Sequence, residues 1–123
     1  MKNLVAIIVL MFTTTAFSQA ETYVRTYKGF VTEIASVKKD YEEMRAVVIF
    51  HPGGRNEIIV NVNEAVVRYF PISQPEKTTD DKGNNFQLVE CIKENTGKIV
   101  QLHVYVEKLR IYIENDYIEF LNL

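Results

Sequence analysis

The sequence predicts an all-β fold, a single antiparallel meander of about eight short strands that forms a small barrel or a sandwich. After the first twenty residues no helical period of any length occurs. Short apolar and alternating runs recur instead, separated by turn signals at intervals of roughly 8–12 residues. The links between the runs are short, which favours antiparallel neighbours because parallel pairing needs long crossover connections.

The first element is a secretory signal. Lys2 supplies a positive charge, and residues 4–12 form an apolar run that is too short to span a bilayer. Residues 16–18 then place small side chains at the two key positions of a signal-peptidase site. We therefore expect residues 1–18 to be a cleaved signal peptide and residues 19–123 to be a single β domain. Cleavage after Ala20 is the alternative to cleavage after Ser18.

Charge and cysteine content narrow the class of protein further. Removing residues 1–18 takes away only one charge, Lys2, and leaves 13 basic against 16 acidic residues. Without a basic stripe, no nucleic-acid partner and no anionic lipid surface is expected. Cys91 is the only cysteine, so an internal disulfide is excluded and no lipid-modified cysteine follows the signal. The protein is predicted to be secreted or periplasmic, soluble, and without a membrane anchor after cleavage.

The first half of the domain contains three strands and a marked turn. Residues 23–34 alternate, but neither face is purely apolar, so Gly29 in mid-strand predicts a bulge that changes the buried face. Residues 37–43 are a polar link to a strand over 44–51, whose even-numbered residues are apolar. Residues 52–56, Pro-Gly-Gly-Arg-Asn, form a turn.

The second half continues the pattern of strands and hairpin turns. Asn63-Glu64 fits a two-residue hairpin loop between strands over 57–62 and 65–72. Ser73–Asn84 is the longest polar stretch and is expected to be a mobile loop at one end of the sheet. The last strands are expected over 85–93, 98–106, 109–114 and 117–122, with turns at 94–97, 107–108 and 115–116.

The alternation also predicts which side chains fill the middle of the fold. Inward positions are expected to include one large apolar residue on each of several strands: Phe30, Val48, Phe70, Leu88, Leu102 and Ile111. In the strand over 98–106, Val100, Leu102, Val104 and Val106 share one face. If these side chains meet, no central cavity remains, whereas an open end lined by tyrosine would favour a ligand carrier.

No catalytic or metal-binding constellation is visible, so we expect a protein that is not an enzyme and needs no cofactor or metal. Cys91 lies in an apolar strand and is interpreted as a small buried side chain, with an intermolecular disulfide or exposed thiol, or a nucleophile, as alternatives. His51 and His103 lack the spacing of zinc ligands. Residues 80–85 resemble a calcium loop only in composition, and a solvated hairpin is favoured. The glycine pair in residues 52–56 lacks the phosphate-loop spacing.

Three classes of function agree with the sequence. An exported chain of about eight antiparallel strands resembles calycin-type barrels and periplasmic inhibitor barrels in architecture, which implies a binding role. The chain has no tryptophan, and so lacks the Gly-x-Trp that lipocalins usually carry. The first hypothesis is a non-catalytic module that binds a protein or cell-envelope component through its surface or an edge strand. The alternatives are a lipocalin-like carrier of a small apolar ligand and a hydrolase without a linear motif.

Overall fold

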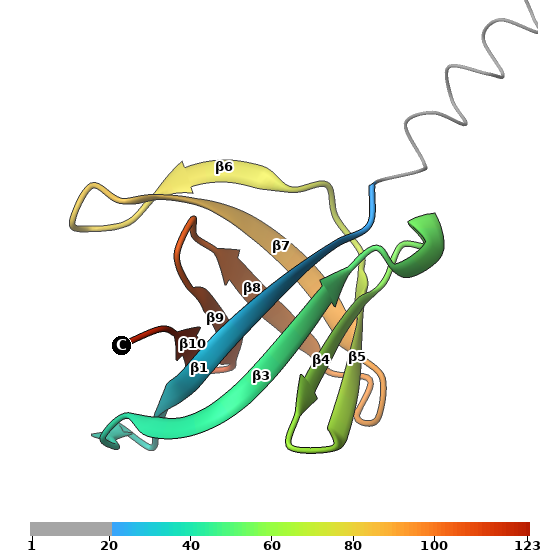
Figure 1. Ribbon diagram of the computed structural model, residues 1–123. Coiled ribbons are helices and arrows are strands. Elements are labelled where there is room, and N and C mark those ends of the chain that lie inside the picture. Colours follow the sequence, from blue (N-terminus) through green and yellow to red (C-terminus); the bar gives the residue numbers. More distant parts are fainter. Residues whose placement is uncertain (1–20) are drawn as a thin grey trace, which may run out of the picture.

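The computed structural model describes residues 21–123, and the predicted signal peptide and its cleavage site lie outside them. The described chain is built from β-strands and one 3-10 turn, η1 (Figure 1). The elements are β1 (Tyr23–Ile34), β2 (Val37–Lys38), β3 (Glu42–Phe50), η1 (Pro52–Gly54), β4 (Ile58–Val62), β5 (Ala65–Pro71), β6 (Glu76–Thr79), β7 (Asn85–Lys93), β8 (Ile99–Val104), β9 (Leu109–Ile113) and β10 (Asp116–Leu121). Over this part of the chain, no helix is long and apolar enough to cross a membrane.

Eight of the strands close into an antiparallel barrel. Their order around the ring is β1, β3, β4, β5, β7, β8, β9 and β10, and β10 pairs back onto β1. Each strand of the ring lies beside the ring strands that precede and follow it in the chain, and the short β2 and β6 lie outside the ring, where they pair with β1 and β7. The predicted all-β antiparallel meander is confirmed, and it closes as a barrel rather than as two packed sheets.

Side chains fill the middle of this barrel. Alternate residues of each strand point inward, and those that are buried in the core come from all eight strands of the ring: Tyr27, Ala46, Val48, Phe50, Ile58, Val60, Tyr69, Val89, Cys91, Val100, Leu102, Val104, Leu109, Ile111 and Phe120. An eight-stranded barrel is just wide enough for side chains to meet across it. Its interior is therefore a packed core, and any sizeable cavity must lie at an end.

Gly29 marks a bulge, as predicted. The pairing of β1 with β3 shifts register between Tyr27 and Gly29. A Cβ atom at position 29 would lie 2.3 Å from the carbonyl oxygen of Glu42 and 2.5 Å from Cζ of Tyr41. Only glycine allows this close approach of two strands. From Gly29 onward β1 pairs with β10 on its other side, and it keeps β3 as a neighbour up to Phe30.

The Asn63-Glu64 hairpin is also confirmed. Val62 and Ala65 face each other across it, and both loop residues have positive φ, 46° and 72°. These values are typical of the turn whose twist matches that of paired strands. The final turn lies one residue earlier than predicted, because Ile113 pairs with Asp116.

Two of the predicted inward positions are wrong. Phe70 is 37% exposed, and the neighbouring Tyr69 is buried instead. The Asn63-Glu64 turn places Ile58 directly opposite Tyr69, so the two share the inward face. Likewise Leu88 lies on the outer face opposite His103, whereas Val89 and Cys91 point inward.

Val106 was predicted to be the last inward residue of its strand, and this is also wrong. β8 ends at Val104, and the backbone N–H of Tyr105 donates to the carbonyl of Lys108 at 2.9 Å to close a tight turn. Val106 at the tip of that turn is 88% exposed. The alternation of side chains ends where the ladder ends, and a β-branched residue in a turn looks like part of the strand in the sequence.

The Ser73–Asn84 segment is not the irregular loop that was predicted. Its centre is β6, which pairs with β7 from Glu76–Leu88 to Thr79–Asn85. Asp80 then closes the hairpin, because its side chain accepts the backbone N–H groups of Lys82 and Asn84 at 3.0 and 2.9 Å. β6 carries no apolar side chain. It is held by backbone pairing, which does not require the alternating apolar residues by which a strand is recognised in a sequence.

Toward one end of the barrel, the seam between β1 and the C-terminal strands is held by side chains rather than by a ladder. β10 pairs with β1 only over Gly29–Glu33. Beyond that point, Asn122 Oδ1 accepts the backbone N–H of Lys28 at 2.7 Å, and Arg25 Nη1 donates to the carbonyl of Tyr105 at 2.5 Å. Arg25 therefore bridges β1 to the turn after β8, beside the open end of the barrel.

Candidate ligand-binding site

A bulge between β5 and β6 opens the barrel at that end. Pro71 pairs with Cys91 and Glu76 pairs with Leu88, so four residues of one chain segment, 72–75, face only two of β7. The extra residues are held at their start, because Ile72 N–H donates to the carbonyl of Glu90 at 2.8 Å. β5 and β6 are thus one interrupted strand. The chain that swings away from β7 forms a rim instead of sealing the barrel.

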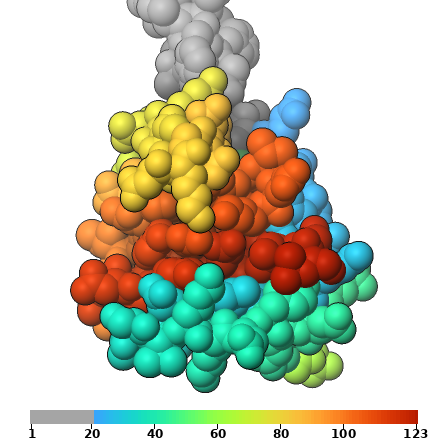
Figure 2. All heavy atoms as spheres, turned by 90° about the vertical axis from the view of Figure 1, so that its left-hand side faces the viewer, coloured from blue at the N-terminus to red at the C-terminus, as the bar shows by residue number. Residues whose placement is uncertain are grey.

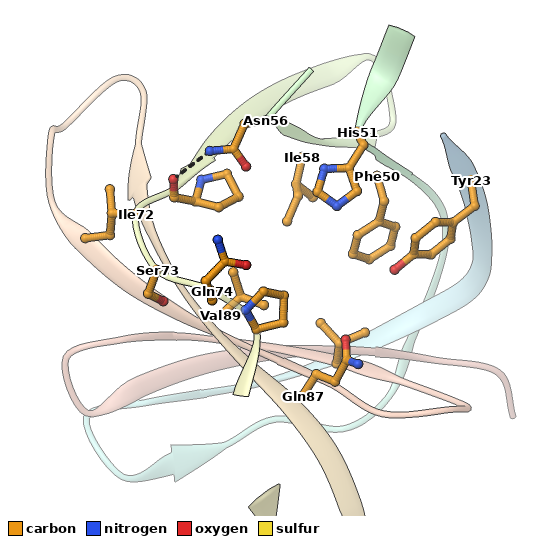
Figure 3. Close-up of a pocket in the computed structure, with 13 residues that line it drawn as sticks. Tyr23, Phe50, His51, Asn56, Ile58, Ile72, Ser73, Gln74, Gln87 and Val89 are labelled. Carbon is orange, nitrogen blue, oxygen red and sulfur yellow. Dashed lines mark hydrogen bonds between the residues drawn. The ribbon is translucent and has the colours of Figure 1, made fainter. Parts of the chain in front are cut away.

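A pocket of about 620 Å³ lies behind this rim (Figure 3). It is enclosed by the start of β1, the segment from the end of β3 to the start of β4, the bulge, and the ends of β7 and β8. The lining residues are Tyr23, Phe50, His51, Asn56, Ile58, Pro71, Ile72, Ser73, Gln74, Pro75, Gln87, Val89 and Val104. This volume is in the range of sites that take small organic molecules.

The floor of the pocket is apolar and its rim is polar. Phe50, Ile58, Val89 and Val104 are buried core residues that also face the pocket. Tyr23 stacks on Phe50, with ring centroids 4.4 Å apart and planes within 7°. Because the deepest surfaces are rings and branched aliphatic chains, they favour an apolar group of a ligand.

The rim carries neutral hydrogen-bonding groups. Within residues 21–123, the side-chain amides of Gln74 and Gln87 hydrogen-bond to no other residue, and in Figure 3 both lie at the pocket together with the His51 imidazole. Asn56 is engaged, since its Nδ2 donates to the carbonyl of Pro71 at 3.0 Å and ties the η1 loop to the end of β5.

Among the described residues 21–123, none of those that line the pocket has a carboxylate, ammonium or guanidinium group. Burial raises the pKa of the Tyr23 phenol, which the nearby Arg25 lowers by a smaller amount. Tyr23 is therefore a neutral phenol near pH 7. The guanidinium of Arg25 contacts this stacked pair, with its Cζ 5.9 Å from the Tyr23 centroid and 5.7 Å from the Phe50 centroid.

The cysteine and the two histidines considered in the sequence analysis lie in three different parts of the structure. Cys91 is fully buried, and burial raises the pKa of its thiol to about 12. The interpretation of Cys91 as a small core residue is confirmed. His51 lies at the pocket rim with a left-handed backbone, φ 54°, and its carbonyl accepts the Thr22 hydroxyl at 2.6 Å. His103 is on the outer face of β8, where it stacks on Phe86 at 4.6 Å.

The two loops with polar or glycine-rich composition have structural roles. Gly53 and Gly54 belong to the η1 turn, and Arg55 forms an ion pair with the nearly buried Glu57 at 3.2 Å. Asp80 is engaged by its own turn, and its Oδ2 also accepts the hydroxyl of Tyr105 at 3.0 Å. Throughout residues 21–123, no three His, Cys, Asp or Glu side chains gather as metal ligands would.

Most of the tyrosines lie away from the pocket. The outer face of β7–β10 carries an aromatic row, in which Phe86, His103, Tyr112 and Tyr117 contact one another in turn at centroid distances of 4.6, 4.7 and 5.4 Å. Figure 2 shows the strands of this face, β8 to β10, as an orange-to-red band below the yellow β6–β7 hairpin. These rings pack on each other and on Arg110, so they form a second, outer cluster.

Gln74 and Gln87 were not predicted to line a pocket. A signal for both of them was present. Gln87 is a polar residue at an inward position of a strand whose other inward residues are Val89 and Cys91. Gln74 precedes a proline between two segments that pair with the same strand. A polar residue at an inward position and a proline-bearing interruption both indicate an opening.

Comparisons with protein-family models, with curated proteins and with solved structures found no match to this chain. The residues of the pocket are therefore the basis for a proposed function.

Proposed function

We propose that the protein is an exported, non-catalytic binding protein that holds an uncharged, amphipathic small molecule in the pocket at the open end of the barrel. The observation that carries this proposal is the lining itself. A pocket of about 620 Å³ combines an apolar floor with free amides at its rim and no charged group. A charged ligand would lose its hydration in this pocket without gaining an oppositely charged partner. A neutral ligand has a much smaller free energy of hydration to lose.

The same lining supports binding rather than catalysis. Hydrolysis needs a nucleophile or paired carboxylates beside a general base. Among the described lining residues His51 carries the only imidazole, and none of the others is an aspartate, a glutamate or a cysteine. The export part of the proposal rests on the predicted signal in residues 1–18.

The experiment is a binding series with neutral, anionic and cationic compounds of similar size, beginning with the neutral dye Nile red. We expect saturable binding of the neutral members and none of the charged ones. Tyr23→Ala should weaken the affinity about tenfold, because an aromatic contact of about 1–1.5 kcal/mol is lost. Phe70→Ala is the matched control, since Phe70 is an aromatic residue of similar exposure, 37% against 41%, that does not line the pocket.

Two results would contradict the proposal. Equal loss of affinity in Tyr23→Ala and Phe70→Ala would place the ligand elsewhere on the surface. A change in the mass of the bound compound during incubation would show turnover, and would favour the hydrolase alternative.

A further inference from the structure

β6 has a free edge. Each strand of the closed ring has a backbone neighbour on both sides, whereas among residues 21–123 β6 pairs with β7 alone. In Figure 1 it runs along the top of the barrel, above β7. β5 and β6 both pair with β7 along one edge. Along the other edge β5 pairs with β4, whereas β6 has no described neighbour, so the free edge of β6 begins next to the rim of the pocket.

The register shows which backbone groups this edge presents. The N–H of Asp80 donates to the carbonyl of Asn84 at 2.9 Å, so Asp80 turns its backbone groups toward β7. Backbone direction alternates along a strand, so Thr78 and Glu76 also bond to β7. Lys77 and Thr79 therefore turn their N–H and C=O groups outward, and both residues are exposed.

The edge is bounded at both ends. Pro75 has no N–H and precedes the strand, and the Asp80 turn ends it. Two donors and two acceptors in the spacing of an extended chain remain between them. Another extended backbone matches that spacing, which is how peptides add to exposed sheet edges.

A second copy of this chain fits the edge poorly. A two-fold pairing centred on Thr78 would place Glu76 opposite Asp80 of the other copy, and one centred on Lys77 would place two lysines opposite each other. Like charges directly opposite are destabilising in antiparallel pairs. A pairing centred on Thr79 runs past the end of the strand into the turn. The charges of β6 thus oppose self-association, a common protection of edge strands.

We propose that β6 is a docking edge for an extended segment of a different polypeptide, one that carries an acidic residue opposite Lys77. The partner segment pairs its backbone with Lys77 and Thr79, and its carboxylate faces the Lys77 ammonium across the new ladder. This second site is distinct from the ligand pocket, and it matches the hypothesis of an exported module that meets a protein of the cell envelope.

The test uses two seven-residue peptides of alternating threonine and valine, one with a central aspartate and one with a central lysine. Amide hydrogen exchange of the full mature protein is followed residue by residue. Without peptide, Lys77 and Thr79 should exchange much faster than Thr78, whose N–H is bonded to β7. The aspartate peptide should slow exchange at Lys77 and Thr79 at least fivefold, and the lysine peptide should have a smaller effect.

A pair of variants at one position isolates the backbone contribution. Thr79→Pro removes an outward N–H without touching the bonds to β7, whereas Thr79→Ala removes the same side chain and keeps the N–H. We expect Thr79→Pro to lose the peptide effect at Lys77 and Thr79→Ala to retain it. Tyr23→Ala, which alters only the pocket, should also retain it.

Two results would overturn the proposal. One is unchanged exchange at Lys77 and Thr79 at millimolar aspartate peptide. The other is an equal peptide effect in Thr79→Pro and Thr79→Ala, which would mean that the outward N–H takes no part. Neither result bears on the ligand pocket.

Discussion

Replacing Arg110 by methionine tests the ion pair that organises the outer face of the barrel. Glu119 is only 8% exposed, and Arg110 Nε donates to its Oε2 at 2.6 Å. Arg110 Nη2 donates to the same oxygen, and Lys108 Nζ lies 3.5 Å from Oε1. The guanidinium also lies over the ring of Tyr117, with Cζ 4.3 Å from the centroid. Glu119 is therefore a nearly buried carboxylate held mainly by one arginine.

The magnitude follows from what the substitution leaves behind. Removing one partner of a buried ion pair costs about 3–5 kcal/mol, because the other charge stays buried without compensation. Here Lys108 remains within 3.5 Å of Glu119, so the expected loss is smaller, about 2–3 kcal/mol. Methionine keeps most of the apolar stem of Arg110. For a domain of this size, such a loss lowers Tm by roughly 10–20 °C.

The assay is equilibrium denaturation of the mature protein, with Lys98→Met as the control. Lys98 and Glu114 are also an ion pair, at 3.7 Å, but their side chains are 59% and 78% exposed. Its loss should change the free energy of unfolding by less than about 0.5 kcal/mol. If Arg110→Met costs less than about 1 kcal/mol, this expectation is wrong, because Glu119 would then tolerate burial without its main cationic partner. When Arg110→Met shows the expected loss, adding Glu119→Leu to it should recover stability, because no buried charge remains.

Four further outcomes are expected. Cys91→Ala should lose about 1–2 kcal/mol of stability, and the native thiol should react with a thiol reagent far more slowly than a free peptide does. Hydrogen bonds from Asn84 and Tyr105 are among the causes that lower the pKa of Asp80. The stability they confer is thus complete above the ordinary carboxyl pKa and is lost as pH falls through the lowered one, a loss that Asp80→Asn should abolish in acid-denaturation curves. Glu64→Gly should stabilise by about 0.5–1 kcal/mol in thermal unfolding, because φ at this position is 72°. The intact mass of the exported protein should correspond to a chain that starts at Gln19. A mass that corresponds to a chain including residue 1 would contradict the predicted signal.

The strands of the ring were predictable because most of them are bounded by a local signal. The Asn63-Glu64 pair, the glycine at position 29 and the alternation around Val48 and Leu102 depend on neighbouring residues alone. The inward face of β5 and β7 was harder, since Phe70 and Leu88 are as apolar as Tyr69 and Val89. Only pairing across the sheet decides between adjacent apolar residues.

The pocket and β6 were less predictable for a different reason. β6 is held by backbone hydrogen bonds to β7 and carries polar side chains, so nothing in its composition distinguishes it from a loop. The pocket is formed by residues from five separate segments, and its volume depends on how far residues 72–75 depart from β7. No single stretch of sequence records that distance.

The interruption between β5 and β6 also separates the size of the opening from the integrity of the barrel. The ladder pairs on either side of it, Pro71–Cys91 and Glu76–Leu88, are fixed independently by β7. Residues can be inserted between Ser73 and Pro75 without shifting the register of either pair, and the added chain costs little entropy. Deleting two residues would instead restore a continuous strand and seal the barrel. In chains of this design, the length of one short segment is enough to change which ligands are admitted.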